Sequence, residues 1–154
     1  MQIIKNISDF RLSKFLSKEI IEEKEFDYAG VDGVAEVLGW HIVIFRELEN
    51  LECTSAISLS DANYNNELSD LVNLILSELN INLQVGDCFQ KIKDKFGQPF
   101  SCDEVIEEMK RYNYLLDNNS IFACFGVDIH EGLISIEIIS NKKIIDGIIN
   151  EKWR

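Results

Sequence analysis

The stretch YNYLLDNNSIFACFGVDIHEGLISIEII, residues 112–139, decides the fold. It contains three apolar runs, at residues 112–116, 120–129 and 133–139, separated by the polar segments 117–119 and 130–132. Asparagine, aspartate and glycine dominate these two separators and are typical of tight turns. In the last run isoleucine alternates with serine and glutamate, so one face of a strand would meet the core. The stretch therefore predicts an antiparallel meander.

Two helices are expected ahead of this meander. Apolar residues recur at helical spacing at positions 68, 71, 72, 75 and 79, with acids between them. A shorter helix follows Gly86, with Asp87 as the expected N-cap. Gly97 is placed to end this helix, and Pro99, the only proline in the chain, bars its continuation.

The remaining segments are assigned by the same rules. Residues 10–20 form an apolar stripe that predicts a first helix, capped by Ser8 or Asp9. Gly30 and the Asp32-Gly33 pair indicate a turn. Residues 34–45 are predicted as one central strand, and residues 53–59 as a second strand. Residues 144–149 fit either a helix or a hairpin around an Asp-Gly turn, and we favour the helix.

Strands and helices are segregated along the chain rather than alternating. This order predicts an α+β fold with a mainly antiparallel sheet and two to four helices, in a single domain over residues 1–154. With 46% hydrophobic and 27% charged residues, the composition is that of a folded protein. Charges interrupt the first twenty residues, so no secretory signal is visible and we expect a soluble, cytoplasmic protein without membrane contact.

Residues suited to catalysis or metal binding are sparse. The four cysteines, at 53, 88, 102 and 124, form no C-x-x-C pair, and His41 lies far from His130 in sequence. We therefore expect structural thiols, no metal and no cofactor. Cys124 and His130 could form a nucleophilic pair, but a buried Cys124 would have a raised pKa. No nucleotide-binding glycine loop or G-x-S-x-G motif is present, so the sequence predicts no enzyme.

The charge distribution is the most informative functional feature. The net charge is −12, and the 44 residues between Arg46 and Lys91 carry eight acids without a lysine or arginine. A nucleic acid is disfavoured as partner, because phosphate binding needs a cationic footprint. The acids either keep the protein soluble or form a surface for a basic protein, whose approach they would accelerate.

We take the second interpretation as the working hypothesis. The candidate partner-binding residues are Glu47, Glu49, Glu52, Asp61, Tyr64, Glu67 and Asp70. Tyr64 is the candidate aromatic anchor within this set; the alternative is that it packs on Leu68. On this hypothesis, replacing the first three glutamates with lysine abolishes the complex, and association slows steeply with salt.

A family resemblance implies a biological role for such a surface. It rests on the pattern V-G-D-x-x-x-x-I-x-x-x-F-G-x-P at residues 85–99, followed by Y-x-Y at 112–114 and G-L-I-S-I-E-I at 132–138. The arrangement resembles small bacterial immunity proteins of contact-dependent inhibition and related polymorphic toxin systems, over roughly residues 67–139. The segment 85–99 also resembles the short helix of small α+β inhibitor and lipoprotein domains. The immunity resemblance implies a cytoplasmic protein that neutralises one cognate toxin domain, often a basic nuclease.

Two other classes of function remain open. The chain could be an enzyme or small-ligand-binding module with a pocket between the sheet and the helix at 68–79. It could also be a structural protein that associates with itself.

Overall fold

The computed structural model describes residues 4–106 and 108–151. The strands are β1 (Glu22–Tyr28), β2 (Val31–Leu38), β3 (Ile42–Glu47), β4 (Thr54–Leu59), β5 (Ser101–Ile106), β6 (Met109–Leu116), β7 (Ile121–Asp128) and β8 (Gly132–Ile139). The helices are α1 (Asn66–Glu78), α2 (Phe89–Phe96) and α3 (Lys142–Asn150), with short 3-10 helices η1 (Leu12–Lys14) and η2 (Leu48–Asn50). The predicted α+β class is confirmed.

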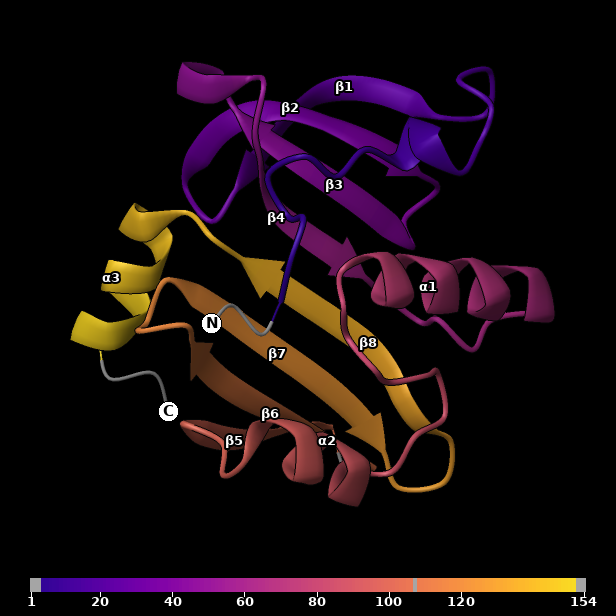
Figure 1. Cartoon of the computed structure of the whole chain (residues 1–154), viewed down its shortest axis with the longest axis vertical. Coiled ribbons are helices and arrows are strands. Elements are labelled where there is room, and N and C mark those ends of the chain that lie inside the picture. Colours follow the sequence, from indigo (N-terminus) through magenta and orange to yellow (C-terminus); the bar gives the residue numbers. More distant parts are fainter. Residues whose placement is uncertain (1–3, 107, 152–154) are drawn as a thin grey trace.

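All eight strands belong to one antiparallel sheet with the order β1-β2-β3-β4-β8-β7-β6-β5 (Figure 1). Each half is a meander of four strands, and the pairing of β4 with β8 joins them, placing Ile57 beside Ile138 and Ser58 beside Glu137. The predicted C-terminal meander is confirmed as β6, β7 and β8. It gains a fourth strand, β5, which the sequence analysis did not assign.

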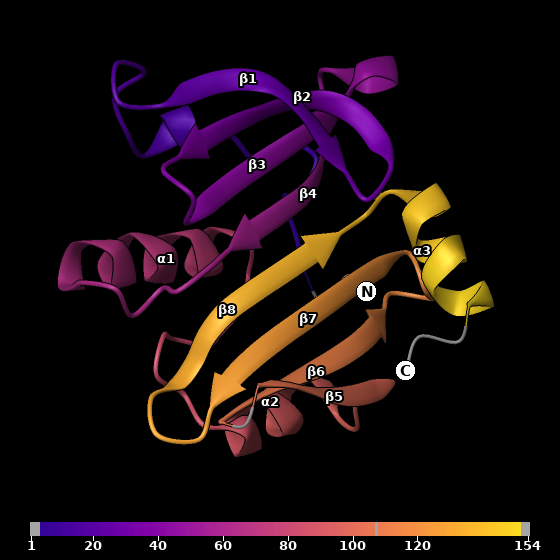
Figure 2. The same cartoon turned by 180° about the vertical axis from the view of Figure 1, so that it is seen from behind.

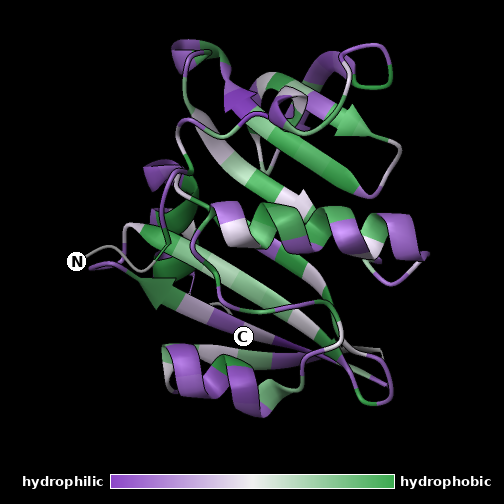
Figure 3. Ribbon diagram, turned by 45° about the vertical axis from the view of Figure 1, so that its right-hand side comes forward, coloured by the Kyte–Doolittle hydropathy of each residue, from purple (hydrophilic) through white to green (hydrophobic). Residues whose placement is uncertain are grey.

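The first face of the sheet is covered by three segments. The N-terminal segment crosses it, and α1 and α2 lie on the same side (Figure 1). Phe10 and Leu12 from the crossing segment are buried against Ile44 and Ile57 of the sheet. Helix α1 presents an apolar stripe to this core, as its alternating hydropathy shows (Figure 3). Its four buried residues are Leu68, Val72, Ile75 and Leu76.

The second face is covered by α3 and by the curled β1–β2 hairpin (Figure 2). The hairpin can curl because Gly33 lacks a side chain: a Cβ there would lie 2.1 Å from the Arg46 carbonyl oxygen and 2.6 Å from the Phe45 ring. Tyr28, near the hairpin tip, stacks on Phe45 with ring centroids 5.5 Å apart. Its hydroxyl donates a hydrogen bond to Glu137 of β8. In a flat sheet β1 and β8 would be about 19 Å apart, so the hydrogen bond between Tyr28 and Glu137 forms only because the hairpin curls over the sheet.

The N-terminal third corrects several sequence predictions. The predicted first helix over residues 10–20 is wrong: only η1 forms there. Tertiary contacts satisfy the backbone instead, since the Ser8 carbonyl accepts from the Thr54 N–H and the Leu12 N–H donates to the buried Glu36 carboxyl group. Tertiary bonds of this kind outweigh a weak helical preference.

The single central strand predicted over residues 34–45 is also wrong. Gly39 adopts a φ of +56° and opens a turn between β2 and β3, so Trp40 and His41 lie in that turn. The turn predicted at Gly30 is confirmed, but Asp32 and Gly33 lie within β2.

The predicted helix ends are mostly confirmed. Helix α2 ends at Gly97, whose φ is +83° and whose N–H donates to the Lys93 carbonyl. The N-cap position of α2 is Cys88, not the predicted Asp87, whose carboxyl group accepts from the Gln84 N–H instead. The favoured C-terminal helix is confirmed as α3, capped by the side chain of Asn141.

The β1–β2 turn contains a strained residue. Ala29 has a φ of +51° and Gly30 one of +85°, the pattern of a type I′ turn, which favours Asn-Gly. We predict that Ala29→Asn stabilises the protein by about 1 kcal/mol, because asparagine tolerates this conformation better than alanine. Ala29→Val should destabilise it, since a β-branched residue fits poorly there. Urea unfolding measures both, and a stabilising valine would contradict the assigned turn.

The Tyr28–Glu137 bond gives a second prediction. Tyr28→Phe removes the donor from a half-buried carboxyl group and should lower the free energy of unfolding by about 1.5 kcal/mol. Burial, and secondarily the charge and hydrogen bond of Glu137, raises the pKa of Tyr28 above its usual range. Above pH 10 the unfolded tyrosine therefore loses its proton before the folded one does, and stability falls. The Phe variant should lose less stability between pH 9.5 and 11; equal slopes would contradict this role.

Candidate functional site

The predicted acidic residues lie at two opposite ends of the β3–β4 hairpin. Glu47, Glu49 and Glu52 lie at the end that carries η2. Asp61, Tyr64, Glu67 and Asp70 lie at the other end, in the β4–α1 loop and the first turns of α1 (Figure 1). A six-residue strand separates the two sets by about 20 Å. The structure therefore divides the predicted surface into a first acidic cluster (47, 49, 52) and a second acidic cluster (61, 67, 70).

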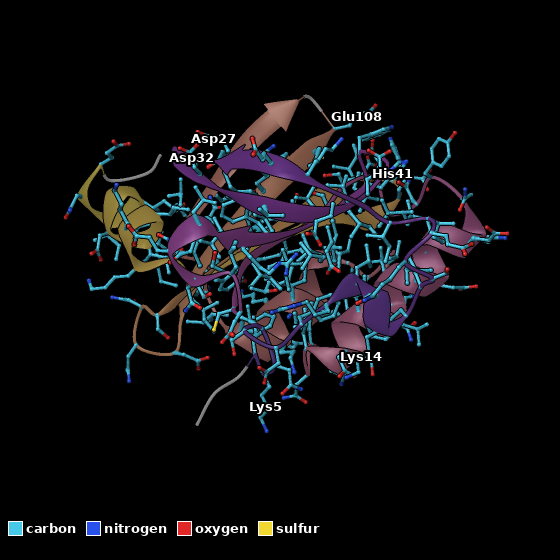
Figure 4. All side chains as sticks on the ribbon, turned by 90° about the horizontal axis from the view of Figure 1, so that it is seen from above. Lys5, Lys14, Asp27, Asp32, His41 and Glu108 are labelled. Atoms are coloured by element: carbon cyan, nitrogen blue, oxygen red, sulfur yellow. The ribbon has the colours of Figure 1, made fainter. Side chains whose placement is uncertain are left out.

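Three aromatic side chains gather beside the second acidic cluster. The Trp40 and His41 rings have centroids 3.9 Å apart, and the His41 and Tyr64 rings have centroids 4.9 Å apart. Trp40 is 62% exposed and Tyr64 is 68% exposed, so large apolar area faces solvent. We call Trp40, His41 and Tyr64 the aromatic shelf. Figure 4 shows His41 at the end of the strands opposite Asp27 and Asp32.

Backbone hydrogen bonds hold the shelf in place. The Ser60 N–H donates to the His41 carbonyl at 2.7 Å, and the His41 Nδ1 lies 3.0 Å from the Ser60 carbonyl oxygen. The Tyr64 N–H donates to the Asp61 carbonyl at 2.9 Å. One residue further on, the Asn65 side chain caps α1. The β2–β3 turn and the β4–α1 loop are thus fixed to each other, which lowers the entropy lost on binding.

The two clusters differ in how their acids are engaged. Within residues 4–106 and 108–151, neither cluster forms an ion pair with a lysine or arginine. In the first cluster, Glu47 accepts a hydrogen bond from Asn141, the residue that caps α3. All three acids of the second cluster are exposed. Its Glu67 also lies in the first turn of α1, near the positive end of the helix dipole, which stabilises the helix.

The sequence analysis anticipated only part of the shelf. Tyr64 was predicted as the candidate aromatic anchor, and the structure places its ring beside that of His41. Trp40 and His41 were missed because both were assigned to a buried strand. The signal that could have revealed them is Gly39, since a glycine inside an apolar run often marks a turn.

The small-ligand alternative expects a pocket between the sheet and α1. Five cavities among the described residues have volumes of about 380 to 610 Å³, and none of these five is lined by a residue of α1. One of about 450 Å³ lies between the β1–β2 turn and α3, with Tyr28 and Glu137 in its wall. These two groups already bond to each other. The wall of this cavity thus contains the hydrogen bond that joins the β1–β2 hairpin to β8.

The candidate nucleophilic pair is not assembled. His130 is exposed in the β7–β8 turn, with its Nε2 3.9 Å from a Glu108 carboxyl oxygen. Cys124 lies within β7, opposite Glu137 of β8. It is four residues, or about 13 Å, from the end of β7 that leads into the turn with His130. Desolvation, followed by the charge of Glu137, raises the pKa of the Cys124 thiol to about 12. In the described part of the chain, no group of three or more His, Cys, Asp or Glu residues could hold a metal ion.

Comparison of the chain with family models, curated proteins and solved structures finds no match. Among the described helices, none has both the length and the apolar character that crossing a membrane requires.

The environments of the cysteines predict their reactivity. Cys88 and Cys102 are exposed, whereas Cys124 is 7% exposed with a raised pKa. Brief treatment of the folded protein with iodoacetamide at pH 8 should alkylate Cys88 and Cys102 and leave Cys124 unmodified. Peptide mass spectrometry reads each site separately. In urea all sites should react, and labelling of native Cys124 at the rate of Cys88 would show that it is an accessible thiol.

Proposed function

We propose that this chain is an immunity-type protein that binds and neutralises a basic, nuclease-type toxin domain in the cytoplasm. The observation that carries the proposal is the aromatic shelf beside the unpaired second acidic cluster. Exposed aromatic residues supply the area that anchors an interface, and acids around them reject acidic partners and attract basic ones. Neutralisation follows if the bound chain covers the toxin's active site or substrate groove.

The charge of the whole chain supports the same partner. The net charge of −12 repels nucleic acid and raises the encounter rate with a basic protein. The edge strand β1 adds the exposed acids Glu22, Glu23, Glu25 and Asp27. These also protect the sheet edge from pairing with another chain, which disfavours a self-associating structural protein.

We shift the expected centre of the interface to one of the two acidic clusters. The sequence analysis treated residues 47–70 as one surface, but the two acidic clusters lie at opposite ends of the hairpin. Only the second cluster is joined to exposed aromatic side chains. We therefore place the main contact at Asp61, Tyr64, Glu67 and Asp70, with the first cluster acting by long-range attraction.

A pair of matched charge reversals tests this placement. On this proposal, we expect the gene immediately upstream to end in a short basic domain, which is the candidate partner. Asp61→Lys with Glu67→Lys should weaken the complex with this upstream basic domain at least tenfold, because the reversed charges face the partner. Glu49→Lys with Glu52→Lys makes the same charge change at the other end of the β3–β4 hairpin. This second pair of substitutions should mainly slow association at low salt. Biolayer interferometry at several salt concentrations gives both rates.

The controls separate binding from folding. Each variant's urea midpoint is compared with the wild type, because reversal at Glu67 also removes a favourable interaction with the α1 dipole. Equal loss of affinity from both pairs would show that only net charge matters. Failure of the wild-type chain to bind the upstream basic domain, or to protect cells that express it, would refute the proposed function.

A further inference from the structure

We propose that the aromatic shelf is a receptor for an arginine side chain of the basic partner. This inference rests on the proposed function and names the chemical group that the shelf recognises. It concerns Trp40, His41 and Tyr64 together with the exposed acids Asp61 and Glu67.

The ring geometry favours a flat cation. Trp40 is the side chain with the strongest cation–π attraction, and with 62% of its surface exposed its ring is open to a partner. Tyr64 offers a second open ring on the other side of His41. A guanidinium group is planar, so it stacks on such rings and still directs its N–H groups outward in the plane.

The neighbouring charges favour the same group. Asp61 and Tyr64 belong to one turn, closed by the bond between the Tyr64 N–H and the Asp61 carbonyl. Glu67 follows in the first turn of α1. Both carboxyl groups are exposed, and neither forms an ion pair within the described residues. Carboxylates bind the guanidinium fork through two parallel hydrogen bonds, which the point charge of lysine cannot reproduce.

The rigidity of the shelf makes the recognition selective. The His41 Nδ1 lies within hydrogen-bond distance of the Ser60 carbonyl oxygen, and the Trp40 ring lies against the His41 ring at an interplanar angle of 31°. The β4–α1 loop is tied to β8 by the bond from the Ala62 N–H to the Ile134 carbonyl, at 2.8 Å. The backbone that carries these rings is therefore held in place before the partner arrives, and little backbone ordering entropy is lost on binding.

Tryptophan fluorescence provides a direct test. The chain has two tryptophans, so Trp153→Phe leaves Trp40 as the sole reporter. The probes are two acetylated hexapeptide amides with alternating glycine, one carrying three arginines and the other three lysines. We expect the arginine peptide to quench or shift Trp40 emission and to bind about fivefold tighter than the lysine peptide at 50 mM salt.

Variants made on the Trp153→Phe background test whether the aromatic shelf causes the arginine preference. Tyr64→Ala should reduce the arginine preference to about twofold or less, while Glu49→Lys with Glu52→Lys should preserve the ratio. For Trp40→Ala, isothermal titration calorimetry replaces fluorescence, and the preference should disappear. The variants lie in exposed positions, and their circular dichroism should match the wild type.

The outcomes separate this inference from the proposed function. Equal binding of the two peptides, no binding of either, or an arginine preference that survives Trp40→Ala overturns the arginine receptor. Any of these results leaves the charge-based complex with the upstream basic domain untouched. Conversely, an intact arginine preference without binding of that domain refutes the proposed function and upholds the receptor.

Discussion

The pairing of β4 with β8 holds the two halves of the sheet together. It joins two meanders that come from opposite halves of the chain, and it buries Ile57 and Leu59 beside Ile138 and Ile136 on the first face. On the second face it brings Glu137 to the place where the curled hairpin delivers Tyr28. Without this junction, each half would leave a central strand edge unpaired.

The arrangement of the candidate site depends on the same β4–β8 pairing. The chain leaves β4 at Leu59 and at once forms the loop that carries Tyr64. Because Ala62 bonds to Ile134 at the start of β8, this loop is anchored to the C-terminal meander as well as to the β2–β3 turn. The aromatic shelf is therefore a product of long-range pairing, although its residues come from two short and ordinary turns.

The sequence allowed good prediction where local chemistry and burial agree. The meander, α1, the end of α2 and α3 all follow from apolar spacing and from turn or helix-ending residues such as Gly97. Prediction from the sequence failed where tertiary contacts outweigh the local conformational preference. Residues 10–20 have helical spacing, but the chain there crosses the sheet and satisfies its backbone through Thr54 and Glu36. Strand β1 was missed because five of its seven residues are charged, as suits an exposed edge. Likewise, the acids of the site could be identified from composition, but no pattern indicated that Trp40 and His41 meet Tyr64.

The strand order also has a consequence for synthesis of the chain on the ribosome. The first four strands emerge early, but the neighbour of β4 on its open side is β8, which begins only at Gly132, whereas β4 ends at Leu59. Until β8 has been made, β4 presents an unpaired edge, and the second face also lacks α3. Nascent chains on neighbouring ribosomes could join through such edges. The surplus of acids in the first half makes such nascent chains repel one another, so the charge that we propose attracts a basic partner also opposes their association during synthesis.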